Sequence, residues 1–372
     1  MGYQRIKKGE LKVGDILPWH VYTESGKLLL GKGVEIEGQH QIDMLIRLGF
    51  RTDAVKPNRL SLLTEKEIDN PFAFAEEVLE HLKNILRNLT LPGSDANERL
   101  QYSVILIIKL CREFPDAMLA VVHLFDEKPY SVTHSFHTAI LTSMLCQKME
   151  LSDMVERQYV AAALTANLGM LDLQDTLENQ KTELTEEQRQ RIHEHPALSS
   201  KILERYVTED KDIITIVQQH HENLDGSGYP QGLSGDQITQ GSRIVAVADR
   251  YSSMITQHQY AKKNTAMAVL KKLYVEKGSA LDEEICLLLI NVLGVFPPGT
   301  YVELKNGESA IVTFRARHGD QHWPQVSSFR GVDGGTYINP LHRDSNRPEY
   351  KINKMFLSEQ MPFTYSSIWG YE

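Results

Sequence analysis

Histidines suited to binding a metal ion are concentrated in the middle of the chain. Together with one later aspartate, they are His134, His137, His193, His195, His220, His221 and Asp249. Neutral imidazole is a good ligand for Fe, Mn, Zn or Ni, and a carboxylate can complete such a set. A lone histidine is more often an ordinary core or surface residue, but two of these are adjacent. The grouping therefore predicts a transition-metal site.

The adjacent pair His220 and His221 leads directly into a loop rich in glycine. The notable residues of the loop are Asp225, Gly226, Gly228, Tyr229, Pro230 and Gly232. Glycine permits backbone conformations and close approaches that other residues resist, and proline stiffens a turn. We expect the loop to lie on the surface beside the mouth of the site, where it can direct both imidazoles toward one polar cavity.

Helices must position these residues, because apolar side chains recur at three- and four-residue intervals from about residue 72 to residue 290. The spacing predicts helices over 136–149, 155–168, 185–205 and 211–221. Thr185 and Gln188 form a capping box at the start of the third helix. Two further apolar helices, Phe72–Leu89 and Val104–Leu110, are candidates for a homodimer contact.

Two small modules flank the helical part. Short strands separated by turns precede a helix at His40–Leu48, which Gly49 ends. Near the other end, a turn at Lys305–Gly307 indicates a hairpin. The expected fold is mainly α, with a small N-terminal α/β module and a small C-terminal β module. The predicted division is 1–56 N-terminal module, 57–71 linker, 72–124 connecting helices, 125–295 helical domain, 296–345 β module and 346–372 tail.

Composition excludes several classes of protein. The 372 residues carry a formal net charge of −9, which disfavours non-specific binding to DNA. Cys111, Cys146 and Cys286 are far apart, which argues for a reducing compartment and against a thiolate metal site. No apolar run reaches the roughly 18–20 residues that would span a membrane. We therefore expect a cytoplasmic protein.

The stretch HHENLDGSGYPQGLSG, which begins at His220, resembles the signature of the HD-GYP proteins. The resemblance extends over at least 125–295. It includes His134-Ser135, Leu184–Glu187, His195-Pro196, Arg243–Asp249 and Gly294–Gly299. HD-GYP proteins are HD-domain phosphohydrolases that use two metal ions to hydrolyse cyclic di-GMP. The resemblance implies an HD-type helical bundle acting in bacterial cyclic di-GMP signalling.

The chain departs from the HD-GYP pattern where the pattern carries its chemistry. The family has a His-Asp dyad followed by Ile-Gly-Lys. This chain has Ala166 for the histidine, Asn167 for the aspartate and Met170 for the lysine. The basic pair that the family places after Asp249 is also lost, because His258–Ala261 stands there. Lys262 and Lys263 follow and are candidates for replacing the missing phosphate contacts.

These losses predict a degenerate site. The resemblance implies that the dyad aspartate would bridge two metal ions, and a neutral carboxamide is a poor bridge between two cations. We therefore expect at most one transition-metal ion (Fe, Mn, Zn or Ni), held by His195, His220 and His221. His134 and Asp249 are further candidate ligands. The resemblance implies cyclic di-GMP as a ligand, and diguanylate-cyclase-type proteins or small adaptor domains as partners of the Asp225–Gly232 loop.

Three functions fit these residues. The first is a degenerate HD-GYP protein that binds a cyclic dinucleotide or another protein without turnover. The second is a working phosphodiesterase in which Glu222, Asp172 or Asp225 supplies the missing carboxylate. The third is an interaction module whose histidines are relics. Loss of both dyad residues favours the first and third, and retention of the loop favours the first. His318, Asp320 and His322 are best interpreted as a solvated loop.

Overall fold

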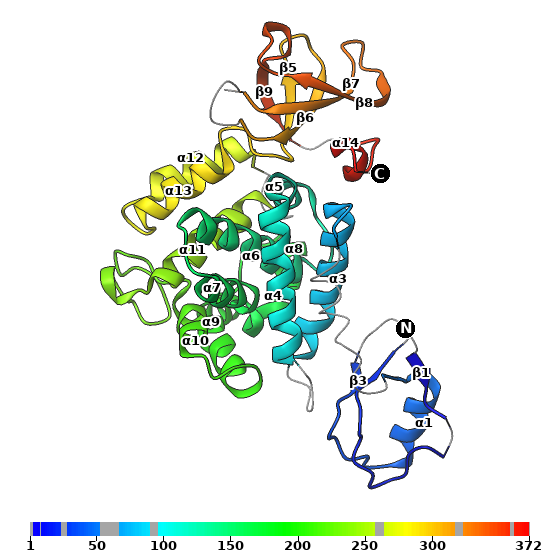
Figure 1. The fold of residues 1–372 in the computed structure, drawn as a ribbon. Coiled ribbons are helices and arrows are strands. Elements are labelled where there is room, and N and C mark those ends of the chain that lie inside the picture. Colours follow the sequence, from blue (N-terminus) through cyan, green and yellow to red (C-terminus); the bar gives the residue numbers. More distant parts are fainter. Residues whose placement is uncertain are drawn as a thin grey trace.

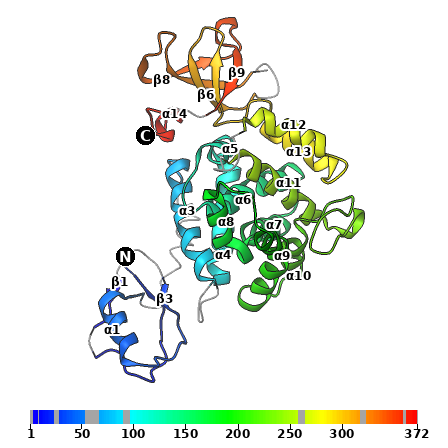
Figure 2. The ribbon, with the colours of Figure 1, turned by 180° about the vertical axis from the view of Figure 1, so that it is seen from behind.

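The chain folds into three successive parts. The computed structural model describes residues 3–7, 9–23, 28–52, 67–89, 96–256, 264–316, 323–357 and 361–371. Figure 1 shows an N-terminal module, a helical body and a C-terminal β module, and Figure 2 shows the two modules at opposite ends of the body from behind. The expected fold class is confirmed. No helix within the described ranges is long and apolar enough to cross a membrane.

The N-terminal module is a small sheet covered by one helix. Its elements are β1 (Tyr3–Arg5), β2 (Val21–Tyr22), β3 (Leu28–Leu30), α1 (Gln39–Leu48) and β4 (Phe50–Thr52), with strand order β1-β4-β2-β3. Leu17, Val21 and Leu45 are fully buried in its core. Gly49 ends α1 as predicted, because a Cβ atom there would lie only 2.4 Å from the carbonyl oxygen of Leu45.

The helical body contains the longest elements of the fold. They are α3 (Pro71–Asn88), α4 (Ala96–Glu113), α5 (Pro115–Leu124), α6 (Tyr130–Lys148), α7 (Asp153–Thr165), η1 (Leu168–Met170), α8 (Leu171–Asn179), α9 (Glu186–Tyr206), α10 (Lys211–Gln219), η2 (Gly235–Gln237), α11 (Gln240–Ile255), α12 (Ala266–Glu276) and α13 (Glu283–Leu293). The capping box of Thr185 and Gln188 is formed as predicted. Asn70 caps α3, which begins at Pro71, the last residue of the predicted linker; residues 57–66 of that linker lie outside the described residues.

Helix α6 lies in the centre of the body. It contacts α7, α11, α4 and α13, and every residue from Tyr130 through Cys146 is buried. A helix that is buried all round must satisfy its polar groups internally. The hydroxyls of Ser135 and Thr138 do so by donating to backbone carbonyls one turn earlier. Helix α6 therefore carries His134 into the interior of the protein.

The helices predicted as dimer contacts face inward. Phe72, Leu79 and Leu82 of α3 are buried against the rest of the body, and so are Val104 and Leu110 of α4. The apolar stripes that suggested a homodimer contact are thus covered by the chain's own core. They are not free to bind a second copy.

The C-terminal module is an antiparallel sheet that is larger than predicted. Its strands are β5 (Tyr301–Leu304), β6 (Ser309–Phe314), β7 (Gln325–Arg330), β8 (Thr336–Asp344) and β9 (Ile352–Phe356), in the order β8-β7-β6-β5-β9. The hairpin predicted around Lys305–Gly307 joins β5 to β6. Strand β9 pairs with β5, which places a sheet strand beyond the predicted boundary at residue 345.

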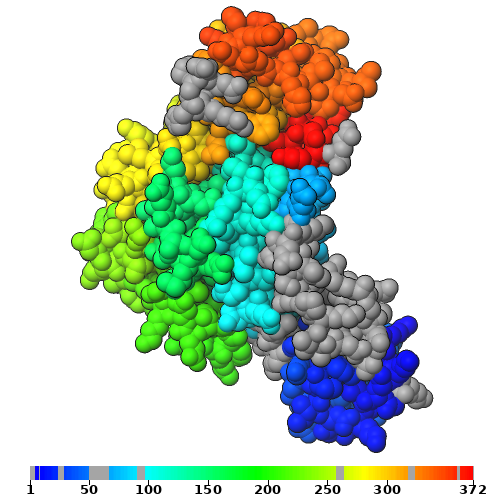
Figure 3. Space-filling view, in the orientation of Figure 1, coloured from blue at the N-terminus to red at the C-terminus, as the bar shows by residue number. Residues whose placement is uncertain are grey.

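The predicted tail also contains a helix that packs against the body. Helix α14 (Tyr365–Trp369) places Trp369 against Phe72 of α3, with ring centroids 4.9 Å apart. The Trp369 indole donates to the carbonyl of Thr313 in β6. Figure 3 shows the red C-terminal residues at the junction of the β module and the helical body. The segment 346–372 was predicted as a tail because it is largely polar, although a few of its aromatic residues pack against the rest of the protein.

Candidate metal centre

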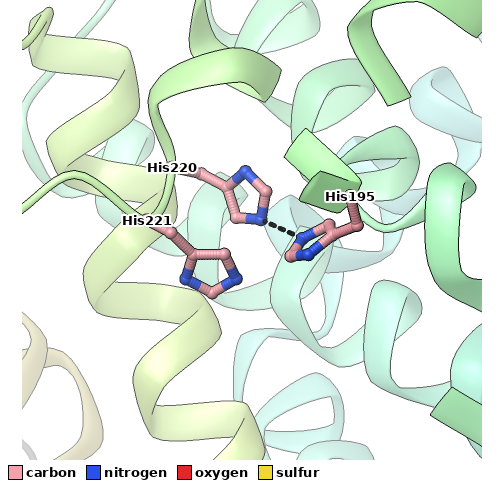
Figure 4. A group of neighbouring side chains, drawn as sticks. All are labelled: His195, His220 and His221. Carbon is pink, nitrogen blue, oxygen red and sulfur yellow. Dashed lines mark hydrogen bonds between the residues drawn. The ribbon is translucent and has the colours of Figure 1, made fainter. Parts of the chain in front are cut away.

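Three histidines from two helices converge on one point. His195 lies in α9, His220 caps the end of α10 and His221 follows it. Their ligand nitrogens all lie within 4.8 Å of one another. Figure 4 shows the imidazoles of His220 and His221 facing the imidazole of His195. His195 and His220 are buried and His221 is half-buried. The structure thus brings together the three histidines predicted as metal ligands.

Backbone carbonyls fix the protons on two of these rings. Nδ1 of His195 lies 2.5 Å from the Ile192 carbonyl oxygen, and Nδ1 of His220 lies 2.7 Å from that of Val217. A carbonyl only accepts, so each Nδ1 must donate and carry a proton. In a neutral ring the other nitrogen, Nε2, then presents a lone pair. This orientation by an outer hydrogen bond is typical of histidines that bind metals.

Burial keeps the three rings neutral. It lowers the pKa of His195 to about 3, with the neighbouring His220 adding to the effect. Burial also lowers the pKa of His220, and lowers that of His221 well below its usual value. Neutral imidazole is the form that binds a metal ion. The site therefore keeps its ligand atoms unprotonated at neutral pH.

The contact between His195 and His220 is that of two facing acceptors. Their Nε2 atoms are 3.2 Å apart. Two neutral rings that both carry their proton on Nδ1 cannot donate to each other through Nε2, so a cation or a hydrogen-bond donor between them is needed to satisfy both lone pairs. A metal ion would meet that need, and the donor set suits Fe, Mn, Zn or Ni. The residues present therefore fit one transition-metal ion.

The glycine-rich loop lies against this cluster. It connects α10 to α11, and Tyr229 stacks on His221 with ring centroids 4.9 Å apart. The buried carboxylate of Glu222 accepts from the backbone N–H groups of Gln231 and Leu233, at 2.6 and 2.9 Å. A Cβ atom on Gly228 would lie 2.3 Å from the Asn223 nitrogen, so only glycine fits there.

Two of the predicted loop residues lie at its outer edge. Asp225 is exposed and accepts from the backbone N–H and the hydroxyl of Ser227, which lowers its pKa. Pro230 is also exposed. Gly226 and Gly232 have positive φ angles of 79° and 68°, a conformation that glycine adopts at little cost. The loop thus combines an inner face on the histidines with an outer face toward solvent.

His134 and Asp249 form a separate pair at the same site. Nε2 of His134 lies 2.8 Å from Oδ1 of Asp249, and both residues are buried. Burial alone would raise the pKa of Asp249. The adjacent His134 ring and its hydrogen bond outweigh burial, with help from His221 and His220, and hold that pKa well below its usual value. Asp249 is thus an ionised carboxylate whose field reaches the three-histidine cluster.

The two positions that the family resemblance assigns to the dyad are buried. Ala166 is fully buried, and Asn167 is 2% exposed. The carboxamide oxygen of Asn167 has no hydrogen-bond partner among the described residues. Just beyond it, a Cβ atom on Gly169 would lie 2.8 Å from the carbonyl oxygen of His195, so η1 packs directly on the ligand-bearing turn of α9. The turn that follows Ala166 and Asn167 therefore packs on the helix that carries His195.

The carboxylates suggested as replacements do not join the cluster. Both oxygens of Glu222 are used by the loop backbone, and Asp225 points into its own turn. Asp172 lines a cavity at the start of α8. Within the described ranges, the one group of three or more metal-type side chains is His195, His220 and His221.

Some of the residues singled out in the sequence lie outside the described residues. They are Lys262 and Lys263, the segment His258–Ala261, and His318, Asp320 and His322.

Several residues support the site through contacts that the sequence did not indicate. The exposed ring of His193 stacks on Tyr229, and the hydroxyl of Ser252 contacts Nδ1 of His134 at 3.2 Å. His137 is buried three residues beyond His134, and both of its ring nitrogens lack partners among the described residues. The two-residue spacing of His193 and His195 could have suggested opposite sides of a helix, but not the stack.

Comparisons with known proteins identify the domain. Residues 120–285 match a family model described as an HD domain. The chain is 26% identical over 223 residues to the cyclic di-GMP phosphodiesterase PA4108 of Pseudomonas aeruginosa, covering 60% of this chain and 52% of that protein. It is 31% identical over 183 residues to the cyclic di-GMP phosphodiesterase PdeB of Borreliella burgdorferi, covering 49% and 48%. The chain thus spans about half the length of the curated relatives it matches.

A solved structure has the same fold. Bd1817, a HDG"Y"P protein from Bdellovibrio bacteriovorus, superposes with a TM-score of 0.50 at 17% identity, over 77% of this chain and 98% of that chain. Residues 120–285 thus match an HD domain, and the predicted resemblance to HD-GYP proteins is confirmed at the level of domain and fold.

Proposed function

We propose that this chain binds cyclic di-GMP and one transition-metal ion without hydrolysing the nucleotide, and acts as a signalling protein in bacteria. The observation that carries the proposal is the pair Ala166 and Asn167. They put a methyl group and a neutral carboxamide where the family resemblance has its His-Asp dyad, while the set of three histidines is kept. The curated relatives named as cyclic di-GMP phosphodiesterases support the choice of ligand.

The proposed lack of turnover follows from what the residues can supply. In-line attack on a phosphodiester requires an activated water molecule, neutralised phosphoryl oxygens and a held substrate. When bound, an ion at the three histidines would polarise a water or a phosphoryl oxygen. Ala166 offers no ligand, and Asn167 offers a neutral oxygen that is a weak bridge to a second ion. Met170 offers no charge where the family resemblance has a lysine.

The rest of the site favours binding. The loop of Tyr229 is fixed to Glu222 by two charge-assisted hydrogen bonds, and its outer face is open to solvent. His134 holds Asp249 in a closed pair, which leaves that carboxylate engaged. A rigid, accessible loop beside a metal site is suited to present a surface to a ligand or to a protein partner. Diguanylate-cyclase-type or adaptor proteins are the partners to test first.

The test combines elemental analysis with nucleotide binding and turnover. We expect purified protein to hold no more than one ion per chain, to bind cyclic di-GMP in a calorimetric titration, and to release no linear dinucleotide or GMP at a useful rate. Robust metal-dependent release that His220→Ala abolishes would contradict the proposal. Trace release would not, because a single ion can support slow hydrolysis.

The second candidate is an active phosphodiesterase with a rebuilt site. The unpartnered carboxamide oxygen of Asn167 favours it, since this oxygen is free to approach an ion. The same turnover assay separates the two candidates. Two ions per chain, together with rapid hydrolysis, would select the second.

A further inference from the structure

A cavity of about 340 Å³ lies between α3, the start of α8 and α9. Arg87 of α3 and Arg191 of α9 both line it, although they are far apart in the sequence. Leu86, Leu168 and Ile202 provide apolar walls. Small-molecule sites usually measure about 300–1,000 Å³ and combine apolar walls with a few polar groups. The size suits one nucleotide or a similar phosphate ester better than a whole cyclic dinucleotide.

The two arginines differ in whether a carboxylate of the protein already pairs with them. The Arg87 guanidinium donates to Asp175 at 2.9 Å, and the Arg87 side chain is 50% exposed. Arg191 is exposed, and no ion pair joins it to a carboxylate within the described part of the chain. One guanidinium group can donate two parallel hydrogen bonds to two oxygens of a phosphate. Arg191 therefore supplies the freer cation, and Arg87 supplies a second one from the opposite wall.

One carboxylate opposes this charge. Asp172 also lines the cavity, and its side chain would repel an anion there. The cavity thus contains one group whose removal should strengthen anion binding and two whose removal should weaken it. Opposite effects from neighbouring residues provide a stricter test than loss of binding alone.

The cavity adjoins the metal centre through a shared turn. Gly169 and Met170 line it, and Gly169 packs against the carbonyl of His195. Met170 occupies the position at which the family resemblance has a lysine. Arg87 lies outside the matched HD domain, which begins at residue 120. Arg87 of α3 and Arg191 of α9 thus line the same cavity as Met170.

We propose that this cavity binds a phosphate group of a nucleotide-type ligand, with Arg191 and Arg87 as its cationic contacts. The inference deepens the proposed function, and it rests on that function only for the identity of the nucleotide. The α3–α9 cavity then makes the helices before the HD domain part of the ligand site.

The test is a set of calorimetric titrations of the full chain with cyclic di-GMP, GMP and inorganic phosphate. We expect Arg191→Ala to weaken nucleotide binding at least tenfold and Arg87→Ala to weaken it severalfold. Asp172→Asn should tighten binding severalfold. Arg189→Ala is the matched control, because Arg189 is an exposed arginine of α9 that pairs with Glu186 and does not line the cavity. It should bind like the unaltered chain.

The outcomes separate this inference from the proposed function. Equal binding of cyclic di-GMP by the unaltered chain, Arg191→Ala and Asp172→Asn would show that the cavity does not bind the phosphate group. The proposed binding of cyclic di-GMP by the chain would stand. Binding of GMP or phosphate, but not of cyclic di-GMP, with loss in Arg191→Ala would support the cavity and overturn the proposed ligand. Failure of all three probes to bind would overturn both.

Discussion

The ring of Tyr229 lies flat on that of His193, with centroids 4.4 Å apart and planes within 2° of parallel. The Tyr229 ring also stacks on His221, at 4.9 Å and 30°. The tyrosine of the glycine-rich loop is therefore held between an exposed histidine of α9 and a candidate metal ligand. This double stack fixes the inner face of the loop over the cluster.

Loss of the outer half of the stack should loosen the loop. Aromatic pairs contribute about 0.5–1.5 kcal/mol beyond burial, so His193→Ala should increase local opening of the loop about 2- to 10-fold. Hydrogen exchange of the amides in 225–233 measures this. His193→Phe keeps a ring at the position and should retain the original protection. Equal protection in all three proteins would show that the stack does not hold the loop.

Removal of one cluster histidine should remove the metal. His220→Ala deletes one of three neutral ligands, so the bound metal should fall from about one ion per chain to near zero. Mass spectrometric elemental analysis gives the ratio, and circular dichroism checks that the chain is folded. His40→Ala alters an exposed histidine of the N-terminal module and should keep the full metal content. Retention of metal by folded His220→Ala would place the ion elsewhere.

Acid should destabilise the protein through His137. Burial, with His134 and His123 nearby, lowers its pKa from 6.5 to about 3. The unfolded chain binds a proton near pH 6.5 and the folded chain does not. Stability is therefore complete above that pH, and falls by ~1.4 kcal/mol per pH unit as the pH drops from 6.5 toward 3. Urea unfolding at several pH values should show that His137→Leu reduces the slope by this amount and leaves the share of the cluster histidines. An unchanged slope would contradict the assignment.

Restoring the dyad should restore a second metal. Ala166→His combined with Asn167→Asp adds an imidazole and a carboxylate at the two positions where the family resemblance has its metal-binding dyad. We expect metal content to rise from about one to about two ions per chain. Because Ala166 is fully buried, overpacking of about 1–3 kcal/mol accompanies the change, so the folded state must be checked. Two ions without hydrolysis would locate the remaining defect at Met170.

Much of the helical body could be predicted from the sequence, because its helices carry regular apolar stripes and local caps. Thr185 and Gln188 marked the start of α9, and the helix predicted from Phe72 corresponds to α3, which begins at Pro71. Strand β9 and helix α14 were missed because their stability comes from distant partners. Trp369 has no local pattern around it, and its burial depends on Phe72.

The candidate site, too, could be predicted only in part from the sequence. His220 and His221 could be proposed from residue type and adjacency, and His195 from the family resemblance; the structure brings the ligand atoms of all three together. The direct pair of His134 with Asp249 could not, because α6 and α11 approach each other only in the folded body. The cavity of Arg87 and Arg191 was also beyond sequence reasoning, since it depends on how α3 packs beside α9.

Helix α14 gives the fold an order of assembly during synthesis. Asn70 bonds to Ser366, and Phe72 is covered by Trp369, so the first helix of the body is completed by residues almost 300 positions later. Closing so long a loop is slow compared with forming local helices. A nascent chain therefore exposes Phe72 until Trp369 has been made. During that interval the apolar patch at the start of α3 is a natural binding site for a chaperone.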